Sequence, residues 1–328
     1  MTQQAYQLDE LNFETTIGGL GAEAELSAIP LIDLSDFPLR RTEITEQLWQ
    51  AATEVGFFQL VNHGIALSEI EQAFTLSEQF FALPVEQKQR FPLKAGLNAG
   101  WEFRQQVRPS TGLADQKESY QITLPHMKAL WPEQELVADF QSHLLSMEYQ
   151  AWQLGMKILS CFADKLGFER DFFTRAHQRD SEHYLSTLRM LHYLPMSDIP
   201  AIGDYWRAGA HTDFDCLTMV FQQENQGGLQ VAAGKDAKQN LLWSNVIPQA
   251  GIITCNIGDM LMRWSDDLLK STLHRVRMPT AEENQGSRYS MAFFCQANRD
   301  QIIQGPQQVY PPITAQDYLK MRLNANFA

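Results

Sequence analysis

Apolar residues recur at helical spacing in three segments of the first half of the chain. Over Glu43–Val55 they fall on one face, which predicts a helix that ends at Gly56. The same periodicity predicts a second helix over Leu67–Phe81, which stops before Pro84, and a long third helix over Leu136–Leu166. Because each helix carries an apolar stripe, we expect all three to pack against a core built from other segments.

Short β-prone runs separated by turn residues dominate the second half of the chain. Two runs, Ile29–Leu34 and Phe57–Val61, already flank the first predicted helix. The later runs are Leu185–Leu194, Leu217–Gln222, Gly228–Val231, Leu241–Val246, Ile252–Ile257, Thr272–Arg277 and Arg288–Cys295. Strands at this spacing predict an antiparallel sandwich or barrel. We therefore expect a mainly β fold with flanking α-helices.

The change from helical segments to β-prone segments also predicts how the chain is divided into regions. Residues 1–27 hold glycines among acidic and small residues, without GxGxxG spacing, and we expect an N-terminal arm there. Residues 28–180 form an N-terminal region whose helices brace the core. Residues 181–328 supply the β core and a C-terminal segment.

Composition and charge narrow the classes of function. Of the 328 residues, 44% are hydrophobic and 20% are charged, which suffices for a full core without disulfides. The 26 basic and 39 acidic residues give a net charge of −13, which argues against nucleic acid and anionic membranes as partners. The four cysteines lack CxxC spacing, which predicts free thiols in a reducing compartment.

Targeting signals are not evident in the sequence. Met1–Glu10 is polar and acidic, unlike a signal peptide, and no apolar stretch reaches the roughly 18 residues of a membrane span. We expect a soluble, cytoplasmic protein with no obligate protein partner.

The segment Ala210-His211-Thr212-Asp213 is a candidate metal site. On an extended chain, residues i and i+2 point to the same side, so His211 and Asp213 can converge on one ion. A third ligand is available in His274, which lies on another predicted strand 63 residues later. Two imidazoles and one carboxylate on one face of an octahedron form the facial triad of non-haem Fe(II) oxygenases and leave three positions open.

Further motifs follow His211 and Asp213 in the sequence. They are Asn256-Ile257-Gly258-Asp259, Leu273-His274-Arg275-Val276 and Arg288-Tyr289-Ser290. The guanidinium of Arg288 and the hydroxyl of Ser290 lie two residues apart on one predicted strand. Both side chains lie on the same face of this strand and can bind a carboxylate near the metal.

Taken together with motifs in the N-terminal part, these motifs resemble the pattern of one known protein family. The N-terminal part adds Ile29-Pro30-Leu31-Ile32-Asp33, Gly56-Phe57-Phe58-Gln59-Leu60-Val61-Asn62-His63-Gly64, then Asp115, Lys117 and Glu118, and the core adds Gly227-Gly228-Leu229-Gln230-Val231. From Ile29 to Arg322 the chain resembles the isopenicillin N synthase-like branch of the Fe(II)/2-oxoglutarate-dependent dioxygenases. The resemblance implies a double-stranded β-helix, or jelly roll, with helices packed outside.

The same resemblance implies cofactors and site residues. His211, Asp213 and His274 correspond to the Fe(II) ligands, while Arg288 and Ser290 correspond to the residues that hold the distal carboxylate of 2-oxoglutarate. Tyr193 stands where relatives have a tyrosine that touches this carboxylate, although Leu194 separates it from Pro195. Asp266-Asp267 stands where many relatives carry Asn-Gly before the third ligand, which changes the turn more than the metal site.

Substrate contacts follow less directly from the resemblance. Gly100–Arg108 corresponds to a loop over the active-site mouth, which makes Trp101, Arg104 and Arg108 candidates, and Phe214 and Phe294 flank the ligand and arginine strands. For each aromatic residue, core packing is the competing interpretation. Arg189 either binds substrate or pairs with a carboxylate.

Four other residues are interpreted as structural. His63 and His192 are expected to be packing residues. Gly258 and Asp259 indicate an Asx-type turn.

Three functions remain open at this point. The first is oxidation, most often hydroxylation, of a small molecule by O2, coupled to conversion of 2-oxoglutarate to succinate and CO2. The second is an oxidase like isopenicillin N synthase, which draws all its electrons from the substrate, and Arg288 and Ser290 do not separate these two. The third is a non-catalytic binding protein on the same scaffold.

Overall fold

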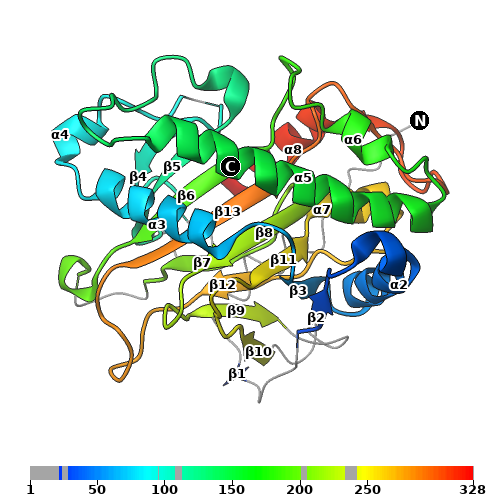
Figure 1. Cartoon of the computed structure of the whole chain (residues 1–328), viewed down its shortest axis with the longest axis horizontal. Coiled ribbons are helices and arrows are strands. Elements are labelled where there is room, and N and C mark those ends of the chain that lie inside the picture. Colours follow the sequence, from blue (N-terminus) through cyan, green and yellow to red (C-terminus); the bar gives the residue numbers. More distant parts are fainter. Residues whose placement is uncertain are drawn as a thin grey trace.

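Two β-sheets form the centre of the computed structural model, which describes residues 22–23, 29–94, 96–107, 113–200, 205–232 and 242–327 (Figure 1). The major sheet has eight strands in the order β2-β3-β11-β8-β13-β6-β5-β4. The minor sheet has five strands in the order β1-β10-β9-β12-β7. Neighbouring strands are antiparallel except β2 with β3 and β1 with β10.

The bounds of the strands are as follows. The major sheet contains β2 (Leu31–Asp33), β3 (Phe57–Val61), β4 (Gly100–Phe103), β5 (Lys117–Ile122), β6 (Thr187–Tyr193), β8 (Leu217–Gln222), β11 (Ile253–Ile257) and β13 (Arg288–Cys295). The minor sheet contains β1 (Ala22–Glu23), β7 (Ala208–His211), β9 (Leu229–Ala232), β10 (Leu242–Asn245) and β12 (His274–Val276). A separate pair joins β14 (Ile302–Ile303) and β15 (Ile313–Thr314).

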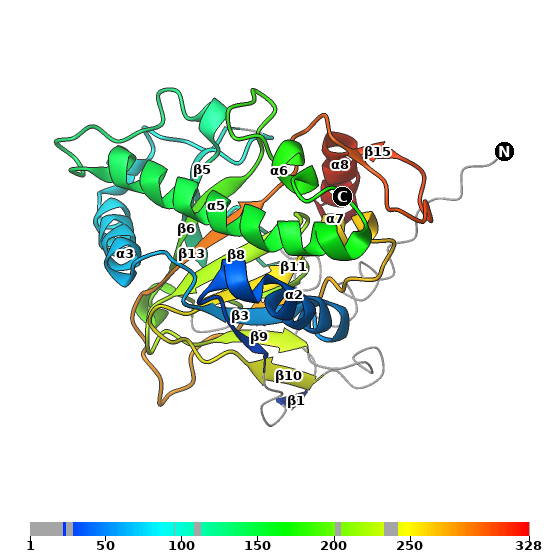
Figure 2. The same ribbon diagram turned by 45° about the vertical axis from the view of Figure 1, so that its right-hand side comes forward.

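Helices cover the outer face of the major sheet. The α-helices are α2 (Phe37–Glu54), α3 (Leu67–Phe81), α4 (Val85–Lys88), α5 (Phe140–Leu166), α6 (Phe172–Ala176), α7 (Asp259–Trp264) and α8 (Ala315–Phe327), with 3-10 turns η1 (Leu124–His126) and η2 (Met196–Asp198). Figure 2 shows α5 running across this sheet between α3 and α6. At Gly155 an added Cβ would overlap the sulfur of Cys295, so the absence of a side chain lets α5 approach β13 closely.

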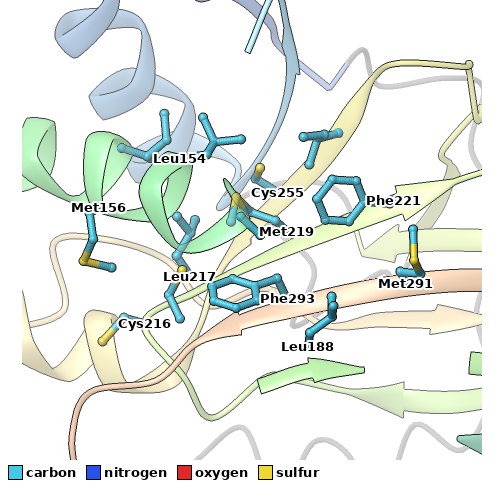
Figure 3. Close-up of a cluster of buried hydrophobic side chains, with 14 of the residues drawn as sticks. Leu154, Met156, Leu188, Cys216, Leu217, Met219, Phe221, Cys255, Met291 and Phe293 are labelled. Carbon is cyan, nitrogen blue, oxygen red and sulfur yellow. The ribbon is translucent and has the colours of Figure 1, made fainter. Parts of the chain in front are cut away.

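Successive side chains of β13 point to opposite faces of the major sheet, and each face packs in its own hydrophobic cluster. Met291 and Phe293 face the helices and pack with Leu154 of α5 and Met219 of β8 in the larger core (Figure 3). Ala292 and Phe294 face the other way, into a smaller cluster between the two sheets that also contains residues of β6, β7, β9 and β12. The inner face of the jelly roll is therefore the face that carries Arg288 and Ser290.

The structure confirms the predicted fold class and most predicted elements. Leu67–Phe81, Phe57–Val61, Leu217–Gln222 and Arg288–Cys295 have the predicted bounds, and the other predicted helices and strands shift by a few residues. The predicted division of the chain at residues 27 and 180 stays a prediction. In the major sheet, the strands from before residue 180 lie at the two edges, β2 and β3 at one and β4 and β5 at the other, and the four central strands come from after residue 180. Ala22–Glu23 of the predicted arm pairs with β10.

Some expectations need correction. Gly100–Phe103 is strand β4 of the major sheet, not part of a loop, and β5 was not predicted at all. Gly258 precedes α7 and Asp259 is its first residue, so the expected Asx-type turn is a helix start. The four cysteines are buried and free, as predicted. No helix within the described ranges is long and apolar enough to cross a bilayer.

Candidate metal centre

Three potential metal ligands meet between the two sheets. His211 ends β7 and His274 begins β12, and these residues are direct partners in the antiparallel pairing of the two strands. Asp213 follows β7 by two residues. Ligand atoms of the three side chains all lie within 4.8 Å of one another. The register of one strand pair thus joins residues that are 63 positions apart in the sequence.

Both imidazoles face the carboxylate with the same nitrogen. His211 Nε2 lies 3.8 Å from one oxygen of Asp213, and His274 Nε2 lies 3.7 Å from the other. Each Nδ1 is bonded to a backbone carbonyl, that of Gly209 at 2.7 Å and that of Thr272 at 3.2 Å. Since a carbonyl only accepts, each Nδ1 carries the proton and each Nε2 lone pair is directed toward the centre of the group.

The carboxylate of Asp213 is fixed by residues of the major sheet. One oxygen accepts hydrogen bonds from Thr218 Oγ1 at 2.6 Å and from Asn256 Nδ2 at 2.8 Å. Burial opposes its ionisation, yet the facing histidines and these two donors hold the pKa of Asp213 below its ordinary value. An ionised, oriented carboxylate is what a metal ligand requires.

A second carboxyl group lies directly behind this ligand. Burial and the charge of Asp213 raise the pKa of Asp215 well above its ordinary range. The raised pKa favours the neutral form of Asp215, which limits the negative charge beside the Asp213 ligand. Two imidazole nitrogens with one carboxylate oxygen form a donor set that suits Fe(II) and leaves positions open for other ligands.

A basic residue lies on the inner face of the neighbouring sheet. Arg288 is 2% exposed and is the partner of Tyr193 in the pairing of β13 with β6. Its guanidinium carbon lies 4.7 Å from the centre of the Tyr193 ring, and its Nε donates to the carbonyls of Gln226 and Gly227. Its Nη1 has no hydrogen-bond partner among the described residues, and Ser290 is buried two positions further on. An unpaired buried donor of this kind fits an anionic ligand such as a carboxylate.

Two family models match the chain. The description of the first is non-haem dioxygenase in morphine synthesis N-terminal, and it matches residues 29–135. The second, the 2OG-Fe(II) oxygenase superfamily, matches residues 185–297, a range that contains the three grouped side chains and Arg288. A 2-oxoglutarate-Fe(II) type oxidoreductase, hxnY of Emericella nidulans, is 30% identical over 90% of this chain and 89% of its own length.

The chain belongs to the Fe(II)/2-oxoglutarate-dependent oxygenases of the isopenicillin N synthase-like superfamily. It is thus an oxidoreductase whose cofactors are Fe(II), 2-oxoglutarate and O2.

Solved structures of similar proteins agree with this assignment. A full-length protein of Neurospora crassa, solved in complex with alpha-KG and thymine, has a TM-score of 0.79 and 29% identity, covering 93% of this chain and 99% of its own. A putative 2OG-Fe(II) oxygenase from Caulobacter crescentus has a TM-score of 0.78 and 30% identity, covering 91% of this chain and 99% of its own. The jelly-roll prediction is thereby confirmed.

In this oxygenase, two of the candidate substrate residues make hydrogen bonds within the protein. Trp101 is 8% exposed in the helix-side core, where its indole N–H donates to Glu118 at 2.6 Å. Arg104 donates to the carbonyl of Asp198 at 2.8 Å. Arg108 lies outside the described residues. The positions of Trp101 and Arg104 favour structural roles.

The two candidate phenylalanines have different surroundings. Phe214 follows Asp213 directly, but the Arg322 guanidinium of α8 lies 4.9 Å from the centre of its ring. Phe294 packs against the cluster between the sheets, with the Arg189 guanidinium 5.0 Å from its ring centre. Arg189 also donates to Gln121 Oε1 at 2.6 Å. Phe294 and Arg189 therefore share the inner face with Arg288, whereas Phe214 faces the C-terminal helix.

Sequence reasoning gave no role to several residues that shape the site. Thr218 and Asn256 orient the Asp213 carboxylate, and both face inward from strands β8 and β11. The only signal for Thr218 was that it is a polar residue in an apolar strand. Asn256 stood inside a family motif, but the sequence did not say which group it would hold.

Proposed function

We propose that this oxygenase hydroxylates a small molecule, with Fe(II) held by His211, Asp213 and His274. The observation that carries the proposal is the convergence of their ligand atoms within 4.8 Å, with both histidine tautomers set by backbone carbonyls. When bound, Fe(II) would activate O2 with electrons from oxidative decarboxylation of 2-oxoglutarate to succinate and CO2. The chain's part is to hold three ligands, leave the other positions open and orient both substrates.

The cosubstrate residues in this proposal are Arg288, Ser290 and Tyr193. The buried Nη1 of Arg288 lacks a partner among the described residues and suits a carboxylate oxygen. Ser290 lies on the same face of β13, and Tyr193 lies on β6 opposite Arg288. A dicarboxylate that reaches from the metal to these residues would lie along the inner face of the barrel.

For the substrate side we propose Phe294, together with Arg189 and Gln121. Phe294 and Arg189 point into the space between the sheets, and Gln121 lies opposite Arg189 in the pairing of β5 with β6. A flat apolar ring beside hydrogen-bonding groups suits a compact, partly polar molecule. The thymine bound to the similar Neurospora crassa protein is an example of such a ligand. A cytoplasmic location, and action without nucleic acid, membrane or an obligate protein partner, stay predictions.

An anaerobic titration tests the proposed function. Addition of 2-oxoglutarate to the Fe(II)-loaded protein is expected to produce a visible metal-to-ligand charge-transfer band, because the cosubstrate would chelate two open positions. An oxidase that draws all electrons from its substrate would show no band. Absence of the band and of 2-oxoglutarate binding at millimolar concentration, in protein shown to hold Fe(II), would overturn the proposal in favour of the oxidase.

The Arg288→Lys variant tests the cosubstrate contact. We expect the KM for 2-oxoglutarate to rise, because an ammonium group cannot reproduce a planar, two-pronged contact with a carboxylate. A cost of about 1.5 to 3 kcal/mol corresponds to roughly a 10- to 150-fold rise. Initial rates of succinate formation at varied 2-oxoglutarate measure it. An unchanged KM with full coupling would assign the arginine another role.

A further inference from the structure

A small cavity of about 50 Å³ lies at the end of the barrel away from the metal ligands. In the pairing of β7 with β12, His211 is opposite His274 and Ala208 is opposite Val276. The cavity is lined by Arg207 and Arg277, the residues just beyond that second pair. Four residues of extended chain place Arg207 about 13 Å along the barrel from His211.

Basic side chains dominate the lining of this cavity. Arg207, Arg277 and Arg288 all contribute, and Glu283 is the one carboxylate among the lining residues that the structure describes. Glu283 is committed to Arg277, whose two terminal nitrogens donate to its oxygens at 2.6 and 2.7 Å. These hydrogen bonds lower the pKa of Glu283 to about 2, so the pair is ionised and internally neutral. Arg207 and Arg288 are left without a matching anion in the lining.

Both of these arginines are buried with unused donors. Arg207 is 4% exposed and Arg288 is 2% exposed. Arg207 donates from Nη2 to the carbonyl of Gly286 at 3.1 Å, but its Nε has no partner within the described part of the chain, nor does Nη1 of Arg288. Burial and the neighbouring Arg288 charge lower the pKa of Arg207 to about 10, which still leaves it charged at neutral pH. Two buried cations with unsatisfied donors are costly unless an anion binds between them.

We propose that this cavity is a binding site for a small oxyanion, a carboxylate or an inorganic phosphate, held by Arg207 together with Arg288. Its volume admits a few waters or one such group, and not a whole dicarboxylate. The oxyanion has two possible sources. One is the distal carboxylate of 2-oxoglutarate, which rests on the proposed function, and then Arg207 is a second guanidinium that selects a dicarboxylic cosubstrate. The other is a free inorganic anion beside the cosubstrate.

Calorimetric titration of the metal-free full-length protein with inorganic phosphate tests the site. We expect one phosphate per chain, with a Kd at least tenfold weaker in Arg207→Gln and partly restored in Arg207→Lys. Arg41→Gln is the matched control, since Arg41 pairs with Asp164 on the helical side of the molecule and should bind phosphate like the wild type. Thermal unfolding of each variant shows whether the fold is retained.

A second titration, with 2-oxoglutarate and Mn(II) under nitrogen, separates the two sources. If the distal carboxylate fills the cavity, phosphate competes with 2-oxoglutarate and Arg207→Gln weakens its binding at least tenfold. If the anion is separate, phosphate binds the 2-oxoglutarate complex with an unchanged Kd. Absence of phosphate binding to the wild type, together with equal 2-oxoglutarate affinity in folded Arg207→Gln, overturns the site. Phosphate binding without any 2-oxoglutarate binding would refute the proposed function and leave the oxyanion site standing.

Discussion

The His274→Ala variant is expected to lose Fe(II) binding and nearly all turnover while it keeps its fold. Two remaining ligands hold a labile metal poorly, and Asp213 loses one of its two facing imidazoles. The sheets should persist because the cores on both sides of the major sheet form without a metal, unlike a zinc finger. Loss of contact with Phe57, whose ring centre lies 5.5 Å from that of His274, adds only a modest destabilisation.

Three measurements check this expectation. Anaerobic chelator competition reports Fe(II) affinity, succinate formation reports turnover, and circular dichroism reports the fold. His183→Ala is a matched control, since its side chain is 38% exposed and its loss should change none of the three. Full turnover in His274→Ala would show that His274 is not a metal ligand.

Short apolar, β-prone runs were sufficient to predict much of the β core. In β13 both faces are largely buried, and the five consecutive apolar residues Met291–Cys295 make the strand visible in the sequence. In β5 all six side chains are buried, yet four of them are polar, namely Lys117, Glu118, Ser119 and Gln121. Such a strand has no apolar pattern to detect, because its burial is made possible by partners elsewhere in the chain.

Glu118 shows why those partners could not be predicted. It accepts hydrogen bonds from Lys88, Trp101 and His192, which come from α4, β4 and β6. Trp101 became a substrate candidate because its segment aligned with a loop, whereas its indole completes this network. Local spacing reveals which residues share a strand face but not which distant side chains meet.

The residues of the candidate site also fall into two groups, those that the sequence predicts and those that only the structure reveals. His211, Asp213 and His274 were predictable, because two ligands share one segment and their residue types restrict the chemistry. Arg207 and Arg322 were not, because arginine is usually exposed and nothing in their sequence surroundings indicates burial. Both are recognised only from the tertiary structure.

The Arg322→Met variant is expected to lower the free energy of unfolding by about 3 to 5 kcal/mol, the range for breaking a buried ion pair from one side. Arg322 extends from α8 into the core, is 0% exposed and pairs with the equally buried Asp259 at the start of α7. It also donates to Thr212 Oγ1 at 3.1 Å, and Thr212 donates to Asp259 at 3.0 Å. Removing the guanidinium leaves a buried carboxylate without its cation, directly behind the turn that joins two metal ligands.

Urea unfolding of the metal-free protein measures this loss. Lys320→Met is the matched control on the same helix, since Lys320 is 62% exposed and pairs with an exposed Asp317, and its change should stay within about 0.5 kcal/mol. Adding Asp259→Asn to Arg322→Met should recover part of the stability, because it removes the buried charge that Arg322 neutralises in the wild type. Equal stability of Arg322→Met and Lys320→Met would show that the ion pair contributes nothing. The Fe(II) affinity of Arg322→Met should also fall, because Thr212 lies between His211 and Asp213 and loses a hydrogen bond that fixes their turn.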